Sequence, residues 1–206
     1  MDPSFLITAW VALFVIIDPI GMTPLFVALT QGDSAARRRA IALRSCIAGA
    51  LILIVFASFG EAVLHFIGIS MPAFRIAGGL LLFLTALDML FDRRSKRRKD
   101  QADEEDERDD PSIYPLAIPL IGGPGAITTV ILLAGQQPGI EGLVWVVGVM
   151  LSVVLLVFLL FLTAGMLERA LGRTGINVIT RLLGMLLAAL AVQFVLDGLK
   201  GFGLAG

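Results

Sequence analysis

The sequence predicts an all-α membrane protein that crosses the bilayer about six times, and three observations support this fold class. Apolar residues make up 57% of the 206 residues, whereas only 16% are charged. Soluble domains carry roughly a quarter charged residues, so most of this chain is too apolar to fold in water. The apolar residues also form long runs, and the charges concentrate in one segment, 92–111.

Six apolar runs are long enough to cross the hydrocarbon, which takes about 20 helical residues. They cover roughly residues 5–30, 41–66, 72–91, 113–134, 142–167 and 176–199. The first run lacks the preceding basic residues and the cleavage site of a signal peptide, so we expect it to be a retained helix. The chain then divides into a three-helix repeat at 1–91, a charged linker at 92–112 and a second three-helix repeat at 113–206.

The linker carries six basic residues between Arg93 and Lys99, followed by eight acidic residues between Asp100 and Asp110. This pattern is typical of a solvated linker, although its basic part could instead contact anionic lipid headgroups. A cytoplasmic linker puts 14 of the 16 Lys and Arg residues inside, as the positive-inside rule requires. We therefore predict a protein of the bacterial cytoplasmic (inner) membrane with both termini outside.

The two halves share a series of residues. Three pairs recur in the same order at an offset of 105 or 106 residues: Pro19 and Pro124, Thr23 and Thr128, and Arg75 and Arg181. Because each half has three spans, the second half enters the membrane from the opposite side. The fold is thus predicted to consist of two inverted three-helix repeats, an arrangement typical of secondary transporters.

The first and fourth spans contain helix-breaking residues at repeat-related positions. The segment DPIGMTP begins at Asp18 and the segment GGPGAIT begins at Gly122. Proline lacks an N–H and clashes with the preceding turn, so we expect both helices to be broken or kinked. The two half-helix N-termini would then face each other and form an electropositive pocket for a small anion. The alternative interpretation is that both breaks are kinks that ease helix packing.

The candidate substrate-binding residues follow from these breaks: Asp18, Pro19, Gly21, Thr23, Gly123, Pro124, Gly125, Ala126 and Thr128. Asp18 is an acid within a span, where it could hold an ammonium group, relay a proton or bind Na⁺; alternatively, it caps neighbouring backbone amides. Thr23 and Thr128 could bond a ligand or satisfy their own helices. Asp18, Arg75 and Arg181 are candidates for gating or coupling, unless the arginines extend to the membrane interface.

Several functional classes lack their characteristic residues. Cys46 is the only cysteine, which excludes an internal disulfide or thiol pair. Glu61 and His65 are one helical turn apart but have no evident third metal ligand. Ser-His and phosphate-loop patterns are missing, and a net charge of −1 gives no reason to expect nucleic acid. We expect neither enzymatic activity nor a cofactor.

Four segments resemble the MarC family of integral membrane proteins. They are IDPIGMTPLF at 17–26, IGISMPAFRIAGG at 67–79 with Ile67 in place of a Phe, PLAIPLIGGPGAITTVILL at 115–133 and GINVITRLLG at 175–184. The resemblance covers essentially the whole chain. It implies six spans, kinship with LysE-type exporters, and transport of small neutral amino acids such as glycine and alanine, coupled to protons or ions. Met22 stands where relatives often carry Asn, which removes a polar group from the first motif.

The residues and the resemblance together predict a secondary transporter or exporter of small neutral amino acids. The carboxylate of a zwitterion would bind the half-helix N-termini around Gly21, Thr23, Gly125 and Ala126, and its ammonium group would lie near Asp18 or freed carbonyls. The expected partners are this solute, membrane lipids and a coupling proton or Na⁺, and a homo-oligomer remains open. The alternatives are a structural or regulatory membrane protein and a channel.

Overall fold

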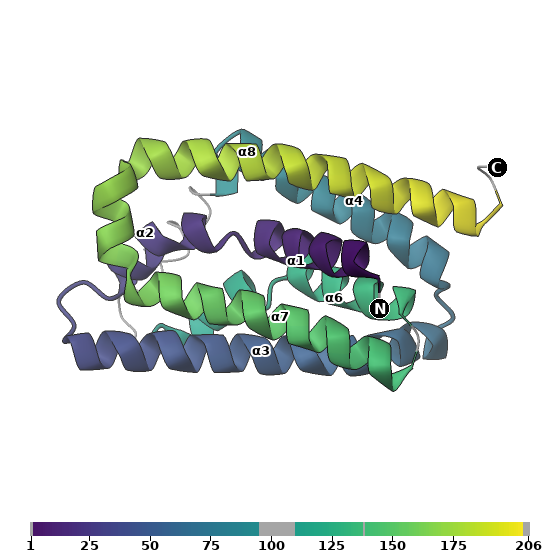
Figure 1. Ribbon diagram of the computed structural model, residues 1–206, viewed down its shortest axis with the longest axis horizontal. Coiled ribbons are helices and arrows are strands. Elements are labelled where there is room, and N and C mark those ends of the chain that lie inside the picture. The colour runs from purple at the N-terminus through teal and green to yellow at the C-terminus, as the bar shows by residue number, and fades with distance from the viewer. Residues whose placement is uncertain (1, 95–109, 138, 204–206) are drawn as a thin grey trace.

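A computed structural model describes residues 2–94, 110–137 and 139–203, and all regular elements in these ranges are helical. The predicted linker segment 95–109 lies outside the described residues. The elements are α1 (Pro3–Ile17), α2 (Pro19–Leu29), α3 (Ala35–Phe66), α4 (Met71–Leu90), η1 (Ser112–Ile121), α6 (Pro124–Gln136), α7 (Ile140–Leu162) and α8 (Ala164–Gly201) (Figure 1).

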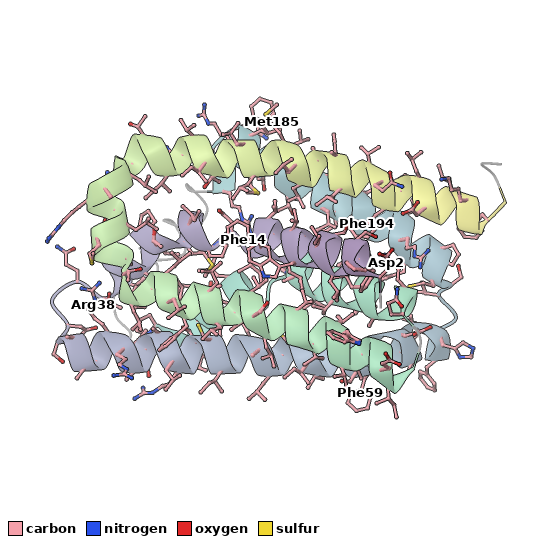
Figure 2. All side chains as sticks on the ribbon, in the orientation of Figure 1. Asp2, Phe14, Arg38, Phe59, Met185 and Phe194 are labelled. Carbon is pink, nitrogen blue, oxygen red and sulfur yellow. The ribbon has the colours of Figure 1, made fainter. Side chains whose placement is uncertain are left out.

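Five helical segments are long and apolar enough to cross a membrane, the first of them comprising α1 and α2 together. The pair formed by η1 and α6 is bent by 51° and makes a sixth candidate span if it crosses as one unit. Large apolar side chains lie on the outer surface, as Phe59 and Met185 do in Figure 2. Such a surface suits lipid, and the chain is an integral membrane protein with several apolar helices.

The predicted fifth and sixth spans differ from the observed helices at their junction. We predicted a span to residue 167, whereas α7 ends at Leu162 and α8 begins at Ala164. The Thr163 hydroxyl bonds to the carbonyl of Leu159 at 2.9 Å, where the chain leaves the helical conformation. Within α8, Gly172 has φ 60° and ψ 172°, and the residues before it lie across the end of the bundle (Figure 1).

The helices pack so that α1 and α2 lie in the interior. Helix α7 packs against α1, α2 and α3, whereas α3 also packs against η1 and α6, and α4 runs along α8. A Cβ atom at Gly79 would lie 2.7 Å from the carbonyl oxygen of Ala191, so α4 and α8 approach to backbone contact. The chain termini lie toward one end of the bundle, and the connection between α2 and α3 lies at the other (Figure 1).

Candidate functional site

The first span is interrupted at Asp18, which lies between the end of α1 and the start of α2. Asp18 has φ 58° and ψ 62°, a left-handed conformation that aspartate tolerates better than most residues. Pro19 follows as the first residue of α2, where its missing N–H costs nothing. The Asp18 side chain is fully buried, so its polar atoms need partners inside the bundle.

The Asp18 carboxylate caps α2. Its Oδ1 atom accepts the Gly21 N–H at 3.1 Å and the Thr180 hydroxyl of α8 at 3.4 Å. A Cβ atom at Gly21 would collide with the same carboxylate, so a larger residue there would displace the cap. The geometry therefore supports the capping role of Asp18 and adds a partner, Thr180, that we did not predict. Its one sequence signal is its place in the GINVITRLLG segment.

Arg94 also reaches this break, although it belongs to the segment 92–112 that we predicted to be a solvated linker. Its Nη2 atom donates a hydrogen bond to the Ile16 carbonyl oxygen at 2.6 Å, and its Nη1 atom lies 3.1 Å from Met89 Sδ. The last carbonyls of a helix lack partners within that helix and carry partial negative charge. Arg94 therefore places a cation on the end of α1, and local sequence gave no signal for this contact.

The second break lies between η1 and α6. Gly123 precedes α6, Pro124 is its first residue, and no described side chain caps this helix. A Cβ atom at Gly123 would collide with the carbonyl oxygen of Pro119, so the backbone can fold back only with glycine. The first N–H groups of α6, at Gly125 and Ala126, consequently begin the helix without a side-chain acceptor.

The two breaks meet through direct packing. A Cβ atom at Gly125 would lie 2.7 Å from Ile16 Cδ1 and 3.4 Å from Leu82 Cδ2. The start of α6 therefore contacts the end of α1, two residues before Asp18. In this conformation the Ile16 side chain fills the space beside Gly125, where we expected part of a shared cavity.

The remaining predicted residues differ in their availability to a ligand. The Thr23 hydroxyl donates to the Ile20 carbonyl at 2.8 Å, so this side chain bonds within its own helix, which is the alternative to ligand binding that we predicted. A Cβ atom at Gly78 of α4 would lie 2.5 Å from the Thr128 methyl group, so that methyl group faces α4. Pro19 and Ala126 are buried, whereas Pro124 is exposed.

The two repeat-related arginines occupy different environments. Arg75 lies between Met71, which approaches Gly135 of α6, and Gly78, which approaches Thr128 of α6. Within the described ranges, the buried Nε of Arg75 has no hydrogen-bond partner. Arg181 is exposed. Arg75 thus has a partly buried guanidinium on the stretch of α4 that faces α6, whereas Arg181 does not share this burial.

A separate surface cleft of about 240 Å³ lies near the start of η1. Its lining residues are Arg37, Ala40, Ile41, Arg44 and Asp110. Arg44 forms an ion pair with Asp110 across this cleft. The Ser112 hydroxyl and, to a smaller extent, Arg44 lower the pKa of Asp110 below its ordinary value. The cleft thus joins α3 to the chain that leads into the second break.

Comparison with known proteins agrees with the resemblance carried by the four segments. The model of the MarC family integral membrane proteins matches residues 3–202. This chain belongs to the MarC family. A UPF0056 membrane protein of Aquifex aeolicus is 39% identical over 94% of this chain and 92% of its own length. The UPF0056 membrane protein YvbG of Bacillus subtilis is 38% identical, over 96% of this chain and 95% of its own length.

The UPF0056 membrane protein YhcE of Escherichia coli is 36% identical over 93% of this chain and 90% of its own length. These names describe membrane proteins and specify no solute. No solved structure matches the chain at a significant level.

Proposed function

We propose that this MarC-family protein is a secondary transporter, or exporter, of small neutral amino acids, and that the solute binds between the two helix breaks. One observation carries the proposal. Helices α2 and α6 both begin inside the bundle, and the start of α6 packs against the end of α1 through Gly125 and Ile16. Interrupted helices inside a membrane protein are costly unless they are buried or line a pathway.

The chemistry of the two helix starts complements a zwitterion. The uncapped N–H groups of Gly125 and Ala126 suit a carboxylate, because a helix N-terminus attracts negative charge. The Asp18 carboxylate and the carbonyl end of α1 suit an ammonium group. Because Ile16 fills the space beside Gly125, α1 must shift for the solute to enter, and only a small side chain would fit.

The exchange of packing partners supports the inverted repeat that such a transporter needs. Helix α3 of the first half packs against η1 and α6 of the second, and α7 of the second half packs against α1 and α2 of the first. This exchange is what a two-fold relation between the halves would produce. In the proposed topology the protein lies in the bacterial cytoplasmic membrane, with both termini outside and the linker inside.

Coupling is assigned to the charged residues of the bundle. Asp18 would bind the coupling proton or Na⁺ together with the solute, because it is a buried acid at the break. Arg75 would act as a gate, because its Nε is buried and has no hydrogen-bond partner among the described residues. Arg181, being exposed, is the weaker gating candidate.

Transport by the purified protein in lipid vesicles tests the function. We expect saturable uptake of labelled glycine and alanine that depends on an imposed proton or Na⁺ gradient. The variant Gly125→Leu should abolish this uptake, because the added side chain would occupy the space between α6 and α1. The capping of α2 by Asp18 favours a purely structural role as the second candidate. If the vesicles take up no amino acid with or without an imposed gradient, that structural role is favoured. A non-saturable flux would indicate a channel.

Topology is tested separately by cysteine labelling on a Cys46→Ser background. A cysteine introduced between residues 100 and 105 should react only from inside the cell, and one at residue 204 only from outside. Labelling of both positions from the same side would contradict the inverted repeat.

A further inference from the structure

We propose that the carboxyl end of α1 is a cation-binding subsite and that Arg94 is its internal occupant. The subsite consists of the Ile16 carbonyl oxygen together with the neighbouring Asp18 carboxylate. Arg94 would hold it until an ammonium group displaces the guanidinium. The inference rests on the proposed function only for the identity of the natural cation, the ammonium group of the solute.

The contact geometry shows that a cation is already bound at this helix end. Arg94 Nη2 donates to the Ile16 carbonyl oxygen at 2.6 Å, a short charge-assisted hydrogen bond. Ile16 itself is only 2% exposed, so this carbonyl lies inside the bundle. The helix dipole adds to the attraction for any cation at this position.

Arg94 follows α4 closely, after the chain leaves the helical conformation. The helix ends at Leu90, and Asp92 adopts a left-handed conformation with φ 57°. The guanidinium then passes Met89 of α4, whose sulfur accepts from Nη1 at 3.1 Å. The arginine thus contacts the end of α1 from the segment after α4, and its displacement requires that the long side chain can withdraw from this contact.

The chemistry of the occupant defines the class of ligand that can replace it. Guanidinium and alkylammonium are both cations that donate N–H groups and accept none, so a carbonyl and a carboxylate suit either. An anion or a neutral donor would not match the subsite. Because Arg94 is tethered, an external cation competes with it. The apparent affinity for that cation is the intrinsic affinity multiplied by the fraction of time that Arg94 is away from the subsite.

The adjacent Arg93 provides a matched control. It is exposed, and its guanidinium lies 5.9 Å from the centre of the Phe91 ring. Arg93→Gln therefore removes the same charge from the same segment without emptying the subsite. Any effect of local charge on cation binding should appear equally in Arg93→Gln and Arg94→Gln.

Calorimetric titration of the purified full-length protein with methylammonium and with guanidinium tests the proposal. Arg94→Gln should bind both cations more tightly than the wild type by about tenfold. Arg93→Gln should bind them like the wild type, and Arg94→Lys, which keeps a tethered cation, should remain close to it. Equal affinities in Arg94→Gln and Arg93→Gln, or no binding by any variant, would overturn the proposal and leave Arg94 as a fixed helix cap.

A second measurement tests the proposal if the Arg94→Gln variant does not fold. A spin label on Arg93→Cys, in a Cys46→Ser background that keeps Arg94, should become more mobile when guanidinium is added, because Arg94 then leaves the break. An unchanged spectrum up to saturating guanidinium would overturn the proposal. Neither measurement needs a gradient. Failure of the vesicles to transport amino acids would therefore contradict the proposed function but would leave the proposed cation subsite unaffected.

Discussion

The two helix breaks of this protein interrupt their spans with the same residue types but satisfy the backbone in different ways. At the first break a buried carboxylate caps α2, the Thr180 hydroxyl bonds to that carboxylate, and Arg94 bonds to the end of α1. At the second break Gly123 folds against the carbonyl of Pro119, and α6 begins without a side-chain cap.

The difference gives the two breaks opposite chemical preferences. The first break is filled by charged side chains and offers acceptors to a cation. The second begins a helix with N–H groups that no described side chain caps, and it suits an anion. Under the proposed function, these two preferences would match the ammonium and carboxylate groups of a zwitterion.

The largest expected effect separates the glycines of the two breaks. Gly123→Ala should destabilise the protein by about 1–3 kcal/mol or more, because the added Cβ meets the backbone carbonyl of Pro119, which cannot move alone. Gly21→Ala should cost less, because the obstacle is the Asp18 side chain, which can rotate away at the expense of the cap. Thermal unfolding in detergent measures both, and a larger loss in Gly21→Ala would reverse this ranking.

Replacement of the carboxylate tests what the first break requires. Asp18→Ala should cost about 1 kcal/mol, since it removes the helix cap. Asp18→Asn should stay near the wild type, because asparagine also caps and tolerates the left-handed conformation. If Asp18 carries the coupling proton, the pH dependence of transport should flatten in Asp18→Asn. Equal stability losses in the two variants would exclude the capping role.

The arginine pair gives a smaller effect that lies in transport and not in stability. Arg75→Gln should slow amino acid uptake by about fivefold or more, a modest coupling effect, because Arg75 carries a charge with a buried Nε inside the protein. Arg181→Gln should leave uptake nearly unchanged, because this side chain is exposed. Initial rates in vesicles measure both, and equal effects of the two variants would remove the asymmetry between the halves.

The smallest expected effect concerns the ion pair that leads into the second break. Because the pKa of Asp110 is lowered in the fold, its contribution to stability is present above the ordinary carboxyl pKa of 3.8 and is lost as pH falls through the folded value. Asp110→Asn should therefore lower the free energy of unfolding at pH 7 by less than about 1 kcal/mol, because this ion pair is exposed. The difference from the wild type should disappear in acid, and its persistence there would implicate a different contact.

The sequence by itself determined the all-helical membrane class, because long apolar runs can satisfy their backbone in lipid only as helices. Where the helices restart was decided by the structure: α2 begins at Pro19 and α6 at Pro124, first helical positions that tolerate a missing N–H, whereas Pro24, which we expected to restart the first helix, lies inside α2. The inverted repeat and the position of the termini across the membrane remain predictions.

Only the tertiary structure decided which side chains meet at the breaks. Thr180 lies 162 residues from Asp18, and Arg94 lies 78 residues from Ile16, so no local pattern contains either contact. Likewise, Arg75 and Arg181 match in sequence but differ in burial. The physical reason is that a hydrophobic run fixes the length of a helix, whereas its rotation and axial position are set by packing against its neighbours.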